Sequence, residues 1–369
     1  MNNRFSYLLN LVIGLVFVAG LIAIANPAHS FTEGKTIQIL VGYSPGGGHD
    51  VEARLIAHWI GKYLPGEPKS TIVQNMPGAG GIIQTAHVYN KAKRDGLTWA
   101  ILGTTQTSSQ ALATPPPNYD LLKMPQIFAT SGSGAAIVRD FLGIRKAKDI
   151  MKVAPSKIVV SGRTIVGASF LTDVLGLELL GIKGYKYVVG YPGSAQMALA
   201  FFSGEISYVG GTGLHHVVGK AGRYYSAVKE GKAIALWQTG MITPEGKVVR
   251  SPGTEVPTIA EAYKEIHGKE PSGKVWEAYK LAGPTVRTLN RSLALPPGVP
   301  PNRVAILRKA FKKLYSDKAY TKEWGRIFGL KLDFISGADA DKTVRRLLEP
   351  SPGWKFIKNE FIPKLKAKK

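Results

Sequence analysis

The stretch of residues 37–50 constrains the fold more than any other part of the chain. It reads Ile-Gln-Ile-Leu-Val-Gly-Tyr-Ser-Pro-Gly-Gly-Gly-His-Asp, an apolar strand that runs into three consecutive glycines. Asp50 is a suitable N-cap residue, and apolar residues repeat at helical spacing behind it, which predicts a helix over residues 50–64. A strand, a glycine turn and a helix start bring backbone N–H groups together, so this stretch predicts a binding site for a small anion.

The glycine turn does not match the common nucleotide-binding loops. A dinucleotide motif needs glycines in a phase that residues 46–51 lack, and a Walker loop needs Lys and Ser/Thr where the chain has a histidine and an aspartate. Residues 42–46 do match the G-x-S-x-G elbow of serine hydrolases, with Ser44 as the nucleophile. However, the residue after Ser44 is Pro45, which has no N–H to donate to an oxyanion. The turn therefore favours binding over catalysis, with a serine hydrolase as an alternative.

The first thirty residues are typical of a secretory signal peptide. Arg4 precedes a mostly apolar run over residues 8–25, and small residues occupy the positions before a cleavage site after Ser30. An uncleaved membrane anchor is the alternative, because the apolar run approaches spanning length. In both cases the rest of the chain is exported, and we expect it in the periplasm. The absence of cysteine excludes disulfides and thiolate catalysis.

The net charge of +23 favours an anionic partner. No nucleic-acid recognition motif accompanies the charge, and export argues against a nucleic-acid partner, so a small anionic molecule or an anionic membrane surface fits better. The seven histidines show no metal-binding spacing, and the adjacent His215 and His216 are expected on opposite sides of a strand. We therefore expect neither a metal nor a cofactor.

After the signal peptide, strand-like and helix-like runs alternate in two series, as in parallel βαβ units. The first series has predicted strands at 36–41, 70–74 and 98–102 and helices at 50–64 and 80–92, and the second has strands at 157–161, 186–189 and 206–209 and helices at 168–180 and 195–202. A strand at 233–237 and a helix at 303–316 follow. This order predicts an α/β clamshell whose lobes are mostly parallel sheets flanked by helices. We expect lobe 1 to comprise residues 31–132 and 241–369, and lobe 2 residues 133–240, with a ligand in the cleft between them.

Several ordered segments carry a resemblance to a known family. They are Ile39 to Asp50 followed by Ala-Arg-Leu at 53–55, Val-Gln-Asn-Met-Pro-Gly-Ala-Gly-Gly at 73–81, Asp-Gly at 95–96, Leu-Gly-Thr at 102–104, Tyr-Pro-Gly-Ser at 191–194, Ser-Gly-Glu at 203–205, Val-Pro-Thr-Ile-Ala-Glu-Ala at 256–262 and Ala-Leu-Pro-Pro-Gly at 294–298. In this order the chain resembles the substrate-binding receptors of tripartite tricarboxylate transporters, the Bug-type periplasmic solute-binding proteins.

The resemblance implies a non-enzymatic, monomeric periplasmic receptor that binds a small carboxylate and delivers it to membrane permease subunits. A sensor that binds the same ligand and acts on a histidine kinase is an alternative with the same fold. The chain departs from the family at residues 161–170, where it has Arg163 in place of the usual Pro and His. This arginine could pair with a distal carboxylate or be exposed. The chain also has Gly-Gly-Thr at 210–212, where many relatives have an acidic residue. The absence of this acid favours a ligand without an amine.

Both the turn geometry and the resemblance direct the ligand to loops at helix starts. The candidate ligand-binding residues are Tyr43, Ser44, Gly47, Gly48, Asp50, Gly81, Thr104, Thr105, Arg163, Ser169, Tyr191, Gly193 and Ser194. For Asp50, a capping role is the structural alternative to ligand contact. His49 lies beside the glycine turn and is expected to line the cleft as a turn residue.

Overall fold

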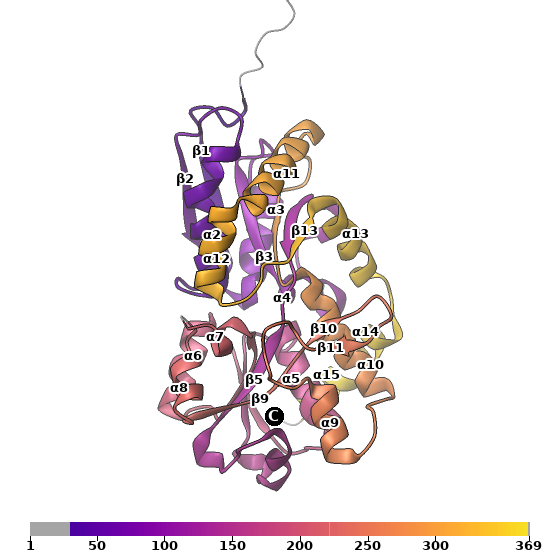
Figure 1. The fold of residues 1–369 in the computed structure, drawn as a ribbon. Helices are drawn as coiled ribbons and strands as arrows, with labels where there is room; N and C mark the ends of the chain where they lie inside the picture. Colours follow the sequence, from indigo (N-terminus) through magenta and orange to yellow (C-terminus); the bar gives the residue numbers. More distant parts are fainter. Residues whose placement is uncertain (1–29, 221, 368–369) are drawn as a thin grey trace, which may run out of the picture.

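The computed structural model describes residues 30–220 and 222–367, which form two α/β lobes stacked one above the other (Figure 1). The predicted signal peptide, apart from Ser30, lies outside the described residues. Within those residues, no helix is both long enough and apolar enough to cross a bilayer.

The upper lobe is built on a six-stranded sheet in the order β13-β4-β12-β3-β1-β2. Its strands are β1 (Thr36–Val41), β2 (Ser70–Asn75), β3 (Thr98–Gly103), β4 (Gln126–Thr130), β12 (Arg291–Ala294) and β13 (Phe334–Ser336). The helices that accompany them are α2 (Gly48–Trp59), α3 (Ile82–Lys91), α4 (Thr104–Leu112), α11 (Pro301–Ser316), α12 (Lys318–Phe328) and α13 (Gly337–Leu348). The aromatic rings of Trp99, Phe128 and Phe311 pack together between the sheet and α11.

The lower lobe is built on a five-stranded sheet in the order β7-β6-β8-β5-β9. Its strands are β5 (Gly134–Arg139), β6 (Val159–Gly162), β7 (Lys186–Val189), β8 (Tyr208–Gly213) and β9 (Ala233–Gln238). The helices around it are α5 (Ala168–Leu179), α6 (Ser194–Ser203), α7 (His215–Val218), α8 (Tyr225–Lys229), α9 (Ile259–His267), α10 (Lys274–Lys280), α14 (Pro352–Phe356) and α15 (Ile362–Lys366). A two-stranded ribbon of β10 (Met241–Ile242) and β11 (Val248–Val249) completes the described strands.

The two-lobed α/β architecture confirms the predicted fold class, but both sheets are mixed rather than mostly parallel. Strands β1, β2 and β3 pair in parallel, as do β6, β7 and β8. The antiparallel pairs are β12 with β3 and β4, β13 with β4, and β5 with β8 and β9.

The sequence pattern also misplaces the start of the first helix. Helix α2 begins at Gly48 with Gly47 as its N-cap residue, so Asp50 lies in the first turn rather than at the cap. The polar helix α4, with the sequence Thr-Thr-Gln-Thr-Ser-Ser-Gln-Ala-Leu, was not predicted because it has no apolar period, although most of its residues are buried.

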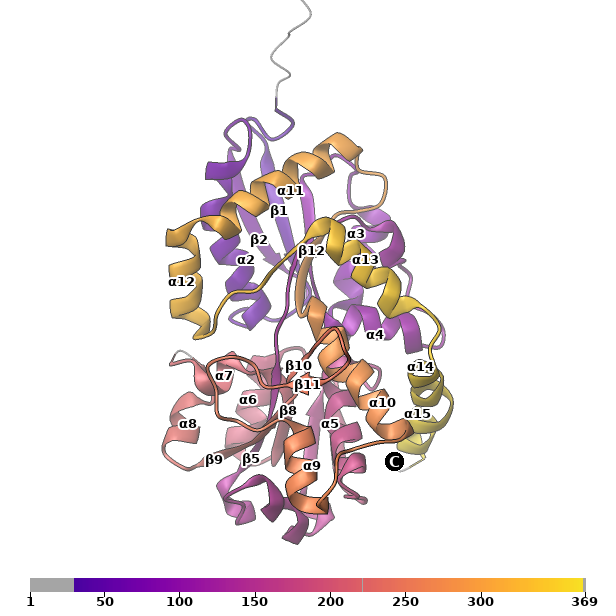
Figure 2. The same ribbon diagram turned by 45° about the vertical axis from the view of Figure 1, so that its right-hand side comes forward.

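Helices α9, α10, α14 and α15 lie beside the lower lobe (Figure 2). Helix α10 packs on α5 and α14, and Lys364 near the C-terminus forms an ion pair with Glu178 of α5 at 2.6 Å. The predicted division places residues 241–369 in lobe 1, and within that range α9 contacts β9 and α10 contacts α5.

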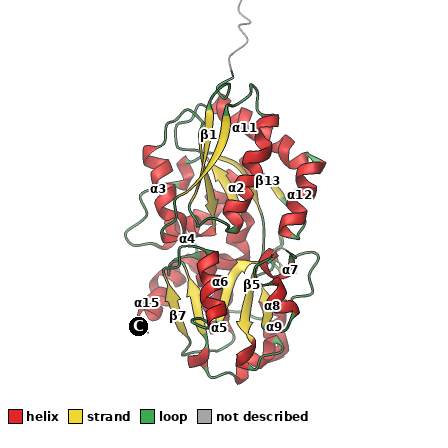
Figure 3. Cartoon of the chain, turned by 90° about the vertical axis from the view of Figure 1, so that its left-hand side faces the viewer, coloured by secondary structure: helices red, strands yellow, loops and turns green. Residues whose placement is uncertain are grey.

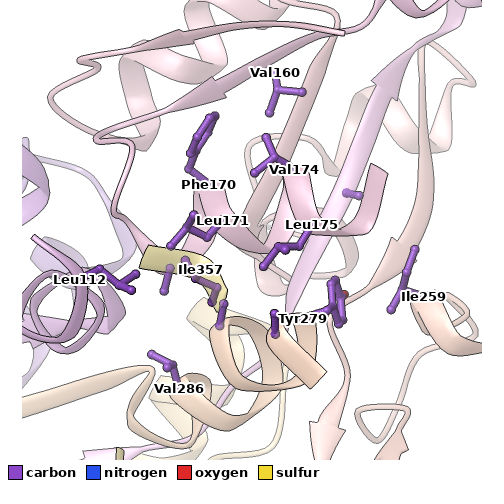
Figure 4. Close-up of a cluster of buried hydrophobic side chains, with 14 of the residues drawn as sticks. Leu112, Val160, Phe170, Leu171, Val174, Leu175, Ile259, Tyr279, Val286 and Ile357 are labelled. Carbon is purple, nitrogen blue, oxygen red and sulfur yellow. The ribbon is translucent and has the colours of Figure 1, made fainter. Parts of the chain in front are cut away.

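One apolar cluster joins both lobes along this side of the molecule. It includes Leu112 of α4, Phe170 and Leu171 of α5, Tyr279 of α10 and Ile357 near the C-terminus (Figure 4). The chain passes between the lobes three times, after β4, before β12 and after α13. In the view turned by 90°, helix α4 lies at the lower edge of the upper lobe (Figure 3), where it contacts α5 of the lower lobe.

Candidate anion-binding site between the lobes

A cavity of about 40 Å³ lies between the two lobes, and residues from both of them form its walls. The upper lobe supplies Tyr43, Gly48, His49, Thr104, Thr105, Arg287, Asn290 and Arg291, and the lower lobe supplies Arg163, Ser169, Ser194, Gly211, Thr212, Gly213, His215 and His216. The lobes touch at its edge, where Arg223 donates to the carbonyl oxygen of Gly46 and to Ser194 Oγ.

Four helices begin at this cavity. Gly48 starts α2, Thr104 starts α4 and Ser194 starts α6, while Ser169 lies in the first turn of α5. Each helix start carries unpaired backbone N–H groups and the positive end of the helix dipole. Four such ends at one small cavity make it favourable for negative charge.

Asp50 shapes the glycine turn from behind the cavity. Its Oδ2 accepts the backbone N–H of Gly46 at 2.8 Å and Arg54 Nε at 3.0 Å, and its Oδ1 accepts Asn75 Nδ2 at 2.8 Å. Burial opposes ionisation, but these hydrogen bonds together lower the pKa of Asp50. All of its bonds are to protein groups that hold the turn, which is a structural role.

Three arginines line the cavity. The Arg163 guanidinium lies 5.2 Å from the ring centre of Tyr43, a cation–π contact across the lobes. Arg287, 3 % exposed, donates from Nη2 to the carbonyl of Gly211 at 2.7 Å. Burial lowers the pKa of Arg287 to about 10, so this side chain still carries its charge at neutral pH. The cavity is therefore bordered by positive charge on both sides.

The buried acids near these arginines do not balance all of their positive charges. Glu52 forms an ion pair with Arg291 at 3.3 Å, with both side chains almost fully buried. Asp173 lies near enough to Arg287 to interact with its charge, yet burial raises the pKa of Asp173 well above the ordinary value. Arg163 makes no ion pair with any described residue. A bound anion would supply the missing counter-charge.

Three histidine rings also surround the cavity, and their arrangement corrects the sequence prediction. His215 and His216 begin the short helix α7 rather than lying on a strand, and their ring centres are 4.0 Å apart. Burial, followed by the nearby charges of Arg223 and Arg291, lowers the pKa of His216 to about 3. Burial likewise holds the pKa values of His49 and His215 well below the ordinary range. The rings are thus neutral at pH 7. No group of three metal-ligating side chains occurs among the residues that the structure describes.

Several polar atoms around the cavity lack a partner in the protein. Arg163 Nε, His49 Nε2 and Thr212 Oγ1 are buried and make no hydrogen bond within the described part of the chain. Buried polar groups without partners are costly, so such atoms indicate a place for a polar ligand or ordered water.

The structure brings seven of the thirteen candidate residues together around the cavity. These are Tyr43, Gly48, Thr104, Thr105, Arg163, Ser169 and Ser194. The other six lie outside the lining. Ser44 and Gly193 face each other at the edge of the cleft, where a Cβ on Gly193 would be 2.9 Å from Ser44 Oγ. Gly81 packs against Gln106 and Tyr43, and the Tyr191 hydroxyl donates to Glu205 at 2.5 Å. The remaining two, Gly47 and Asp50, support the turn.

Sequence reasoning missed the contribution of the chain just before β12. Arg287, Asn290 and Arg291 all line the cavity, and Asn290 Oδ1 accepts from Arg287 Nη1 at 3.2 Å. A signal was present, because Arg287 and Arg291 are the only charged residues of segment 281–298, which leads into Leu293 and Ala294. Arginines in a buried strand need partners, and this requirement could have marked them as site residues.

No protein-family model matches the sequence, and the comparison with curated proteins finds no match. Solved structures do match it along most of its length. A periplasmic transporter structure is 19% identical, with a TM-score of 0.67 over 92% of this chain and 99% of its own. The periplasmic binding protein BugD is 18% identical, with a TM-score of 0.66 over 90% and 97%.

A third similar structure holds a ligand. MatC from Rhodopseudomonas palustris, solved with bound malate, is 18% identical, with a TM-score of 0.64 over 88% of this chain and 99% of its own. At these identities the likeness concerns the arrangement of the chain in space. The protein therefore has the two-lobed fold of the periplasmic binding protein BugD and of MatC.

Proposed function

We propose that this protein is a periplasmic receptor of the Bug type that binds a small carboxylate between its lobes. The observation that carries the proposal is the cavity itself, where four helix starts and three arginines meet and Arg163 has no acidic partner among the described residues. Helix starts and guanidinium groups both bind carboxylates, the first through free backbone N–H groups and the second through charge-assisted hydrogen bonds.

Two further observations support a carboxylate without an amine. No Asp or Glu is part of the described cavity lining; nearby, Glu52 pairs with Arg291, and burial raises the pKa of Asp173 well above the ordinary value. Among similar structures, MatC holds malate and another R. palustris protein holds adipate at 19% identity and a TM-score of 0.66.

We assign the protein a binding role and no catalytic step. Ser44, the candidate nucleophile, lies outside the cavity lining, and the following Pro45 lacks the N–H that an oxyanion hole requires. His49, the histidine nearest in sequence, is stacked 4.2 Å from Tyr43 rather than placed on a serine.

The test is a calorimetric titration of the mature chain, residues 31–369, with malate, adipate and related mono- and dicarboxylates. At least one acid should bind, and Arg163→Gln should weaken its binding at least tenfold, because the variant removes the uncompensated charge but keeps a polar side chain. A tenfold loss corresponds to about 1.4 kcal/mol.

Arg346→Gln is the matched control, since Arg346 is exposed on helix α13 away from the cavity. It should bind the same acid as tightly as the wild type. Equal affinity in the wild type and Arg163→Gln, or the absence of binding to every acid in the panel, would contradict the proposed site.

The transport part of the proposal is that the loaded receptor, acting as a monomer, delivers its acid to membrane permease subunits. Deletion of this chain from its host should then abolish uptake of the acid that the purified protein binds. Uptake that continues at the wild-type rate, together with a lost transcriptional response to the acid, would instead favour a sensor.

A further inference from the structure

A second cavity of about 280 Å³ adjoins the first one. It lies between the chain passage at residues 131–133, the end of α12 and the loop that follows it. One side of it is apolar and is formed by Met241, Trp324, Phe328, Leu330 and Leu332, and the opposite side carries the hydroxyl groups of Ser131, Ser133 and Ser251. The two cavities share three lining residues, His215, Asn290 and Arg291, so they are adjacent spaces within the same interlobe region.

The Arg291 side chain forms the partition between the two cavities. On one side its Nη2 points towards the start of α2, 2.8 Å from where a Cβ on Gly48 would lie. On the other side its guanidinium plane lies 4.7 Å from the ring centre of Phe328. His215 completes the partition, with its Nε2 3.3 Å from Arg291 Nη2 and its ring edge-on to Phe328 at 5.2 Å. Because Arg291 lines both cavities, a carboxylate bound to it at the edge of this partition would lie next to the apolar space.

The volumes of the two cavities indicate that they hold different parts of a ligand. With the lobes in contact, the anion-binding cavity of about 40 Å³ accommodates little more than a carboxylate group. The neighbouring cavity is seven times larger and close to the lower end of the size range of small-molecule pockets. Its apolar side would stabilise hydrocarbon.

We infer that the apolar cavity receives the hydrocarbon body of the ligand, so that the preferred ligand is an amphipathic acid with an aromatic or aliphatic body. This inference rests on the proposed function, because Arg291 and the helix starts must hold the carboxylate. It adds the class of ligand, which the anion-binding cavity alone does not specify. Lys331 and Asp333 are exposed at the rim, where they leave the apolar interior undisturbed.

The experiment compares 3-(4-bromophenyl)propionate with propionate, two acids that differ only in the aryl body. Affinity for the aryl acid is measured by calorimetry, and binding of propionate by the shift in melting temperature at millimolar concentration. The aryl acid should bind at least tenfold more tightly than propionate. Its bromine should also quench the fluorescence of Trp324, and this quenching should disappear in Trp324→Phe.

Leu332→Trp tests the location, since it fills the apolar cavity from a loop position outside the anion-binding cavity. It should weaken binding of the aryl acid at least tenfold and leave the propionate response unchanged. Leu199→Trp is the matched control, because Leu199 is 70% exposed on α6, and it should bind both acids as the wild type does.

The outcomes separate the two proposals. If the aryl acid binds no better than propionate, or if Leu332→Trp and Trp324→Phe leave its affinity and quenching unchanged while Arg163→Gln weakens binding, the apolar site is disproved and the receptor function stands. If no carboxylate binds and Arg163→Gln has no effect, both proposals fail. If Leu332→Trp fails to fold, the quenching in wild type and Trp324→Phe decides the question.

Discussion

Glu52 of helix α2 holds the side chain of Arg291 in place, although nothing in the sequence distinguishes Glu52 from an ordinary helix residue. Its side chain is 1% exposed, and Oε2 pairs with Arg291 at 3.3 Å while Oε1 accepts the Tyr315 hydroxyl at 3.0 Å and Trp324 Nε1 at 3.3 Å. These partners come from β12, α11 and α12. One carboxylate therefore links the first helix to the C-terminal helices and orients the guanidinium at the cavity.

Glu52→Gln should lower the free energy of unfolding by about 3–5 kcal/mol, because it leaves the buried charge of Arg291 without its partner. Urea unfolding followed by far-UV circular dichroism measures the change. Glu67→Gln, at an exposed position, should stay within about 0.5 kcal/mol of the wild type. An equally small effect of Glu52→Gln would mean that the ion pair contributes no net stability.

His216 connects the cavity to the pH dependence of stability. Its pKa is about 3 in the folded protein, where burial and the charges of Arg223 and Arg291 oppose protonation, and about 6.5 in an unfolded chain. Between these values the unfolded chain binds a proton that the folded protein does not. Stability from this group is therefore complete above pH 6.5 and is lost as the pH falls towards 3.

We expect the drop in the free energy of unfolding between pH 6.5 and pH 5 to be about 2 kcal/mol smaller in His216→Gln than in the wild type. Urea unfolding at the two pH values provides both numbers. His267→Gln, on the exposed end of α9, should keep the wild-type pH dependence. A drop of the same size in His216→Gln and the wild type would show that His216 is already free to protonate in the folded protein.

At the scale of elements, the site is made where helix starts from the two lobes approach one another. The turn before α2 and the turn before α6 meet at Ser44 and Gly193, where the space left by the missing side chain of Gly193 is occupied by Ser44 Oγ. Arg223 then bridges Gly46 and Ser194 over the same contact. The glycine is required here by close approach rather than by its backbone angles, since its φ of −169° is extended.

Gly193→Val should therefore keep the lobes apart. In small-angle scattering with ligand added, the variant should have a larger radius of gyration than the wild type, and its affinity for the acid should fall at least tenfold. Gly61→Val is a suitable control, because a Cβ there meets only Pro68 at an ordinary 3.6 Å. A variant that closes and binds like the wild type would show that this contact does not limit closure.

Most elements could be read from the sequence because their apolar residues repeat regularly. Strand β7 has the predicted bounds, and helices α5 and α11 agree with the prediction to within two residues. Helix α4 was not predicted because its buried residues are mostly Thr, Ser and Gln, and a buried helix is recognised in a sequence by its apolar residues. His215 and His216 were misassigned because two adjacent residues carry no period that distinguishes a strand from a helix start.

At the scale of the whole molecule, the sequence by itself determined the α/β class, the two lobes and the glycine turn at residues 42–48 that precedes a helix start. Those features depend on local periodicity and on glycine, which act within a few turns of chain. Only the tertiary structure decided which charges face the cavity. Arg287 and Arg291 are separated from Arg163 by more than a hundred residues, and Asp50 is not part of the cavity lining although it adjoins the turn. Such placements depend on the passages between the lobes and on how the sheets pack, and neither leaves a local pattern in the chain.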